Sequence, residues 1–524
     1  MPIRRTFLLA LLVSSLAFYN MLVFSSSING HLHLEYVQPA MASTSSPYSL
    51  YLPLVSNRFP LETVFGVEMD QITTDGGLDK VAEANTTWVR RNGVLWAEIE
   101  PNEGARDWSV LGGLEQELKN ASANNLQVIL IVRKTPSWAQ KVPGSSCGPI
   151  KTEKLGAFGN FMFDLVSRYS TPPYNVKYWE LWNEPDVSPE LAAYIGGDTI
   201  PFGCWGDSAD PYYGGKYYAE MLKAVYPRIK AADPQAQVLV GGLLLDCDPR
   251  GSPSICNQIK HDDRPAKFLE GILLNNGGFY LDGVGFHGYD DYYGTFGKYG
   301  NLNWGSKWNT TGPSITARAQ YIKYLLNTYH TSGKFIMNTE TAMICGGFND
   351  PPGQPPCELD FEQTKAYYIT QMYAASIAEG LRASIWYSVT GWRNSDLLCS
   401  DCASTLKTSM LDFKPPAQNS SLLTSNGDPR PAYYAYKFAR LELGDASFGG
   451  EIGSGDLGEI YGIKGYKFFR GNRTIWLLWS LDGDTHLISL FSPPLAAWDA
   501  LGNSVTPDKL INVNMMPLYL EWSR

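Results

Sequence analysis

The hydrophobic positions of the chain fall into short runs separated by longer amphipathic segments. Runs rich in Val, Ile, Phe and Tyr cover residues 64–69, 87–91, 126–132, 176–182, 237–245, 281–287, 334–340 and 383–389. Several are continuously apolar, which is typical of strands buried on both faces. Helix-compatible segments such as 214–232 and 364–380 lie between them. Eight strand–helix units favour an α/β fold, a closed (β/α)8 TIM barrel, over an open sheet.

The pattern changes at both ends of this segment. Arg4 and Arg5 precede a long apolar run, which predicts an export signal or an uncleaved membrane anchor. A stretch rich in Ser, Ala and Pro follows, and the chain ends in short strand patterns broken by Gly, Asn and Asp. The predicted domains are a signal peptide or anchor (1–27), a linker (28–58), a catalytic (β/α)8 barrel (59–440) and a small all-β, β-sandwich-like accessory module (441–524).

Composition narrows the function classes. The 524 residues suit one large barrel with a smaller module. The 15 Trp and 31 Tyr provide flat apolar faces of the kind on which sugar rings stack. A formal net charge of -10 argues against a nucleic-acid partner, which would require basic patches. We expect contact with a membrane only through an uncleaved anchor, and the sequence leaves the oligomeric state open.

An even number of cysteines behind an export signal predicts disulfides. The eight candidates are Cys147, Cys204, Cys247, Cys256, Cys345, Cys357, Cys399 and Cys402. Short-range pairing would join 247 to 256, 345 to 357 and 399 to 402, leaving 147 with 204, although connectivity cannot be deduced from sequence alone. Free buried thiols, or zinc at Cys399 and Cys402, are the alternatives. Zinc is disfavoured because Cys399 and Cys402 form a single CxxC element, and neither a second CxxC nor a His pair accompanies it.

Two glutamates stand at predicted strand ends. Glu184 follows the fourth strand in "WELWNEP", and Glu340 closes the seventh in "FIMNTE". Reactive groups of such barrels lie at the C-terminal ends of the strands, so both carboxyls should meet at one mouth. Retaining glycosidic cleavage requires a carboxylic acid that protonates the leaving oxygen and a carboxylate that attacks the anomeric carbon. Pro185 ends the strand, and the Asn183 amide can bind the sugar hydroxyl next to the reacting carbon.

Other polar and aromatic residues are expected at the same mouth. The substrate-binding candidates are Asn183, Arg90, Arg91, Trp138, His287, Tyr289 and Trp386. His287 and Tyr289 could instead be satisfied structural groups, and Trp386 could belong to the core. Glu68 could bind a sugar hydroxyl or pair with an arginine. A metal-dependent hydrolase is disfavoured because the six His include no HExxH pair, and we expect neither a metal nor a cofactor.

Taken together, these motifs resemble the retaining glycoside hydrolases of clan A. The resemblance covers about residues 61–440 and includes "WAEIEP", "TPSWA", "WNEP", "FHGY" and "IWYSVTGW". The all-β tail resembles the accessory module of family 39-like members such as β-xylosidases. The resemblance implies that Glu184 is the acid/base, that Glu340 is the nucleophile, and that an arginine on strand two supports the nucleophile. It leaves open which of Arg90 and Arg91 does so.

The sequence therefore predicts a secreted retaining β-glycosidase acting on oligosaccharides or polysaccharides through two glutamates. A transglycosylase would use the same residues and is not separated from a hydrolase. A non-catalytic carbohydrate-binding barrel is a further alternative, against which the intact Glu184 and Glu340 count. Sugar specificity and exo or endo action stay open.

Overall fold

The computed structural model describes residues 63–194, 202–251, 253–258, 262–292, 304–305, 308, 312–345, 359–390, 420–458 and 461–524. The chain from Arg58 onward forms one compact unit. The predicted signal or anchor and linker lie outside the described residues, and the predicted domain limits stay predictions. In the part that is described, no helix is long and apolar enough to cross a bilayer.

Eight parallel strands form a closed barrel. They are β1 (Phe65–Glu68), β2 (Trp88–Leu95), β3 (Gln127–Arg133), β4 (Tyr178–Leu181), β5 (Gln237–Leu243), β6 (Gly283–Tyr292), β8 (Phe335–Cys345) and β9 (Ala383–Trp386). They pair in the order β5-β4-β3-β2-β1-β9-β8-β6, and β5 pairs with β6 to close the ring. A two-residue strand, β7 (Trp304–Gly305), adds antiparallel to the end of β6. The predicted (β/α)8 barrel is confirmed.

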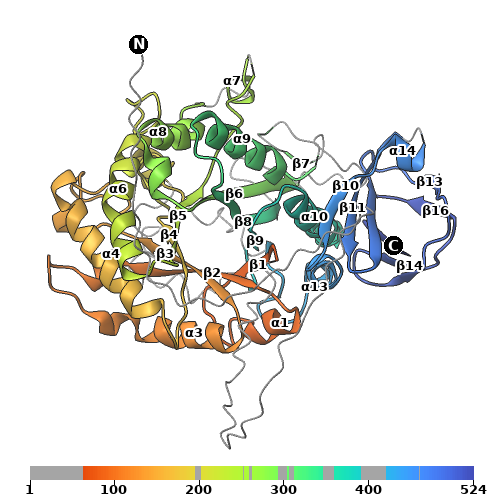
Figure 1. The fold of residues 1–524 in the computed structure, drawn as a ribbon, viewed down its shortest axis with the longest axis horizontal. Helices are drawn as coiled ribbons and strands as arrows, with labels where there is room; N and C mark the ends of the chain where they lie inside the picture. The colour runs from red at the N-terminus through yellow and green to blue at the C-terminus, as the bar shows by residue number, and fades with distance from the viewer. Residues whose placement is uncertain are drawn as a thin grey trace, which may run out of the picture. The chain divides into compact units, whose positions relative to one another are not determined.

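Helices surround these strands (Figure 1). They are α1 (Leu78–Glu83), α2 (Trp96–Ile99), α3 (Gly112–Ala123), α4 (Leu155–Tyr169), α5 (Pro189–Tyr194), α6 (Gly215–Ala232), α7 (Ile255–Gln258), α8 (Phe268–Leu274), α9 (Ile315–Thr328), α10 (Leu359–Ala378) and α13 (Pro431–Leu443). Helix α4 shows why they pack inward, because Phe158, Phe161, Met162 and Leu165 recur at helical spacing and are all buried. A separate apolar layer, which includes Trp88, fills the barrel interior.

The C-terminal segment is all-β apart from one short helix, α14 (Ser454–Leu457). Its strands are β10 (Ser447–Glu451), β11 (Ile463–Arg470), β12 (Arg473–Ser480), β13 (His486–Ser489), β14 (Ala496–Asp499), β15 (Ser504–Val505), β16 (Leu510–Val513) and β17 (Leu518–Ser523). They form a six-stranded and a two-stranded sheet around a core of their own. Phe438 of α13 packs edge-on against Tyr519 of β17, with ring centroids 5.1 Å apart, so the module is anchored on the barrel. The predicted all-β module is confirmed.

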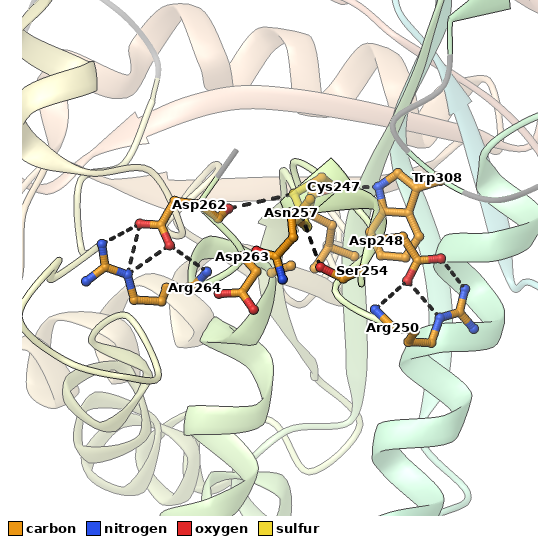
Figure 2. Close-up of a disulfide and its surroundings, with 12 residues drawn as sticks. Cys247, Asp248, Arg250, Ser254, Asn257, Asp262, Asp263, Arg264 and Trp308 are labelled. Atoms are coloured by element: carbon orange, nitrogen blue, oxygen red, sulfur yellow. Dashed lines mark hydrogen bonds and ion pairs between the residues drawn. A yellow bond between two sulfur atoms is a disulfide. The ribbon is translucent and has the colours of Figure 1, made fainter. Parts of the chain in front are cut away.

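Two of the expected disulfides are present. Cys147 bonds to Cys204, which ties the segment after β3 to the segment after β4. Cys247 bonds to Cys256 in the segment after β5, where the neighbouring Asp248 is held by Arg250 (Figure 2). The pairs expected for Cys345 with Cys357 and for Cys399 with Cys402 lie outside the residues whose side chains are described. Both bridges that are described brace loops at the C-terminal ends of the strands.

The longer bridge should contribute more to stability. Cys147 and Cys204 are 57 residues apart, whereas Cys247 and Cys256 are nine apart. In the chain-entropy model, bridges of these lengths contribute about 4 and about 2.5 kcal/mol. We expect Cys147→Ser/Cys204→Ser to lower the melting temperature more than Cys247→Ser/Cys256→Ser in thermal unfolding scans. An equal or smaller loss in the first variant would contradict this account of the bridges.

Candidate active site

The turn after β4 holds two non-glycine residues in left-handed conformations. Trp182 has φ 70° and Glu184 has φ 45°, values that are uncommon for residues with a side chain. Neighbouring strands fix both, because the Trp182 amide donates to the Val132 carbonyl at 2.9 Å and the Glu184 amide donates to the Gly242 carbonyl at 3.0 Å. Strained backbone of this kind is typical of functional sites. The turn thereby places the Glu184 carboxyl over the barrel mouth.

The fifth strand supports the site through its backbone. The Gly242 amide donates to Glu180 Oε1 at 2.7 Å, and its carbonyl accepts from Glu184. A methyl group on Gly242 would collide with the His287 ring and the Thr339 hydroxyl. The glycine in "VLVGGLLL" is therefore needed to let the His287 ring approach the strand.

Arg90 on β2 is the centre of the charge network. Its guanidinium donates to Glu180 at 3.0 and 2.7 Å, to Glu68 at 2.6 Å and to the Asn183 amide oxygen at 2.6 Å, and it also pairs with Glu340 Oε1. The side chain is fully buried. A buried guanidinium with three carboxylates is rigid and always charged, so it presents Glu340 in a fixed orientation.

Glu340 on β8 is placed to act as an anion. Besides Arg90, the Tyr289 hydroxyl donates to its Oε2 at 2.5 Å. Burial raises the pKa of Glu340, whereas Arg90 and the Tyr289 hydroxyl oppose this rise by stabilising the charged form. Both oxygens of Glu340 are therefore held by donors that favour the carboxylate.

Glu184 lies in the opposite environment. Its Oε1 contacts His287 Nδ1 at 2.7 Å, and its Oε2 is buried without a hydrogen-bond partner among the described residues. Burial and the nearby Glu340 and Asp186 carboxylates raise the pKa of Glu184 well above its ordinary value. Burial and Arg90 lower the pKa of His287, so the imidazole is neutral. Glu184 is thus set to keep its proton near neutral pH.

Glu184, His287 and Glu340 each offer an atom within 4.8 Å of the others. One oxygen of Glu184 and one oxygen of Glu340 therefore lie within 4.8 Å of each other, which is compatible with the spacing of about 5–5.5 Å between the carboxyls of a retaining pair. The same three side chains could in principle bind a metal ion. Both oxygens of Glu340 are already engaged, one of them by the Arg90 cation, so the donor set fits the proton-transfer chemistry of a glycosidase better than a metal site.

The structure brings together Glu184, Glu340, Asn183, Arg90, His287 and Tyr289 from the sequence-predicted set. Arg91 is not among them, because its guanidinium pairs with Glu117 of α3 at 2.7 Å. Successive strand residues point to opposite faces, so only Arg90 of this arginine pair can enter the barrel. Arg90 is therefore the arginine that faces the carboxylates.

The two predicted tryptophans also have structural contacts. Trp386 is fully buried in the core that the strands share with the helices, and its indole N–H donates to the Ser420 carbonyl at 2.9 Å. Trp138 packs edge-on against Trp96 and donates to the Glu100 carbonyl at 3.0 Å. The structure shows neither of them in contact with the carboxylate pair.

Tyr387 and Glu180 belong to the site although the sequence did not single them out, and Glu68 pairs with an arginine, one of the two alternatives left open for it. Tyr387 follows Trp386 and points to the opposite face, where its ring lies edge-on to Tyr289 with centroids 6.2 Å apart. Glu180 and Glu68 hold Arg90. Side chains alternate between the two faces of a strand. Once one inward-facing residue of each strand is known, this alternation predicts that Tyr387, and not Trp386, faces the barrel interior, and that Glu180 does so while its neighbours do not.

No family model and no curated protein matches the chain. Solved structures of similar fold include glycoside hydrolases. A family 39 glycoside hydrolase from Bacteroides cellulosilyticus has a TM-score of 0.61 at 16% identity, over 88% of this chain and 81% of the other. A family 30 endoxylanase from Clostridium papyrosolvens has a TM-score of 0.53 at 12% identity, over 88% and 96%. The family 30 xylanase C from Talaromyces cellulolyticus has a TM-score of 0.52 at 14% identity, over 88% and 98%. At these identities the likeness is one of fold.

Removing the Tyr289 hydroxyl should change the pH dependence of activity. The hydroxyl stabilises the Glu340 carboxylate, so Tyr289→Phe raises the pKa of Glu340. If Glu340 must be ionised to react, activity is lost as pH falls through this pKa, so the acidic limb of the kcat/KM profile should move to higher pH. At its pH optimum, kcat/KM of Tyr289→Phe should be about 10- to 100-fold lower than that of the wild-type protein. An acidic limb at unchanged pH would argue that Glu340 is not the group that titrates there.

Proposed function

We propose that the protein is a retaining β-glycosidase that cleaves O-glycosidic bonds by double displacement. The observation that carries the proposal is that two close carboxyls have environments that favour opposite protonation states. Glu340 is held as an anion by Arg90 and Tyr289, while Glu184 is buried beside a neutral imidazole with its pKa raised well above the ordinary range. Distinct acid and nucleophile roles require two close carboxyls whose environments differ.

In the first step Glu340 attacks the anomeric carbon while Glu184 donates its proton to the leaving oxygen. This forms a glycosyl ester on Glu340 and releases the aglycone. Once Glu340 is esterified its negative charge is gone, so the main like-charge contribution to the raised pKa of Glu184 disappears. The ionised Glu184 can then take a proton from the incoming water.

The supporting residues have distinct tasks in this scheme. Arg90 and Tyr289 orient Glu340 and disperse its charge. Asn183 accepts from Arg90 through its amide oxygen, which fixes the direction of the amide and supports its proposed role at the sugar hydroxyl next to the reacting carbon. His287 fixes the Glu184 carboxyl through its Nδ1.

Product stereochemistry tests the proposal. We expect proton NMR of a β-glycoside reaction to show the β-anomer of the sugar first, followed by slow mutarotation. A first-formed α-anomer would indicate inversion and overturn the double displacement. A panel of aryl β-glycosides identifies the sugar to use.

Export from the cell belongs to the same proposal, and the two described disulfides support it because such bonds persist in oxidising compartments.

A further inference from the structure

One cation at the barrel mouth has no task in the proposed mechanism. Arg133 is the last residue of β3. Side chains alternate along this strand, since Val128 and Leu130 pack in the core shared with the helices whereas Ile129 lies in the barrel interior. By this alternation Arg133 faces the barrel, at the end where the catalytic groups stand.

Arg133 is held on one edge only. Its Nε donates to Asn92 Oδ1 at 2.8 Å, and Asn92 lies two residues after Arg90 on β2, on the same inward face. Among the described residues no carboxylate lies within ion-pair distance of Arg133, and neither terminal nitrogen has a hydrogen-bond partner there. The two terminal nitrogens of Arg133 are not fully buried and keep some exposure to solvent.

The contrast with Arg90 is informative. Arg90 is buried together with three carboxylates, whereas Arg133 is partly buried with none in contact. Burial lowers the pKa of Arg133 to about 10, and the nearby Glu98 only partly opposes this. The group is still a cation at neutral pH. A partly desolvated cation without a counter-ion attracts an anion strongly, because the screening by water is reduced.

We propose that Arg133 recognises an anionic substituent of the glycan, so that the substrate of this site is an acidic oligosaccharide or polysaccharide. The inference rests on the proposed function. Asn92 fixes the Nε edge, which leaves the two terminal nitrogens to bind two oxygens of one oxyanion side by side. A hexuronate carboxylate and a sulfate ester share this chemistry. The chain as a whole carries a net charge of -10, so selection of an anion needs a local cation of this kind.

Binding to an inert variant tests the inference. In the Glu340→Gln background, calorimetry would compare neutral β-gluco-oligosaccharides with the same compounds oxidised to a carboxylate at C6, and with the same compounds carrying a sulfate ester. We expect one acidic form to bind about 10- to 100-fold more tightly than its neutral partner. Adding Arg133→Gln should remove this preference while changing the affinity for the neutral form by less than about twofold. Adding Arg228→Gln, an equal charge change at an exposed position of α6, should leave the preference intact.

The two acidic forms separate a carboxylate from a sulfate as the anion recognised. Equal affinity for neutral and acidic forms, no measurable binding of either acidic form, or a preference that survives Arg133→Gln would overturn the inference. The outcome is independent of turnover. An Arg133-dependent preference would stand even if the wild-type protein cleaved no glycoside, and cleavage of glycosides without any such preference would remove this inference while leaving the proposed function in place.

Discussion

Glu340→Gln is expected to lower kcat by at least ~10³-fold on every glycoside that the protein cleaves. The amide keeps the size of the side chain, its oxygen can still accept from Arg90, and its NH2 group can donate to the Tyr289 hydroxyl oxygen. It cannot form the glycosyl ester, so the double displacement is blocked at its first step. Steady-state kinetics with an aryl β-glycoside give the number.

The matched control is Glu190→Gln, which removes an exposed carboxylate from the short helix α5 that follows the Glu184 turn. It should leave kcat unchanged. Circular dichroism should show the same fold for both variants. Full activity of Glu340→Gln would remove Glu340 from the nucleophile role.

Glu184→Ala should give a loss that depends on the leaving group. A natural oligosaccharide needs protonation of the departing oxygen, so we expect a loss of at least about 10²–10⁴-fold. A dinitrophenyl glycoside departs without an acid, so its first step should survive and the glycosyl ester on Glu340 should accumulate. A burst of dinitrophenol followed by slow turnover would report this. Equal losses on good and poor leaving groups would contradict the acid role of Glu184.

Azide distinguishes the two glutamates further. It needs no general base, so it should restore turnover of the dinitrophenyl glycoside by Glu184→Ala and give a glycosyl azide of retained configuration. Glu340→Ala should give at most an inverted azide with an activated donor. The absence of azide product from both variants would show that the paired carboxyls do other chemistry.

The barrel could be predicted because several of its strands are continuous apolar runs buried on both faces. The run 126–132 differs by one residue from β3, and the segment 214–232 by one residue from α6. Strand length at the mouth was less predictable. β6 and β8 continue to Tyr292 and Cys345, past the expected ends at 287 and 340, because they keep pairing with each other beyond the apolar runs. Such polar extensions have no hydrophobic signal to mark them.

The carboxylate pair could be predicted because strand ends of a barrel converge on one mouth. The direction of side chains near those ends could not, since a shift of one residue exchanges the two faces. Trp386 and Tyr387 show this, because the first packs among the helices and the second lies beside Tyr289. Gly242 was also not foreseen, because its contribution is a backbone amide and the space it leaves for His287.

Trapping the covalent intermediate tests the two-glutamate mechanism most directly. Dinitrophenyl 2-deoxy-2-fluoro-β-glycosides of several sugars would be incubated with the wild-type protein, and the adduct located by mass spectrometry of the intact protein and of its peptides. We predict one glycosyl adduct per chain, carried by the peptide that contains Glu340. An adduct on another residue, or cleavage of the parent glycosides with no adduct from any fluorosugar, would contradict double displacement through Glu340.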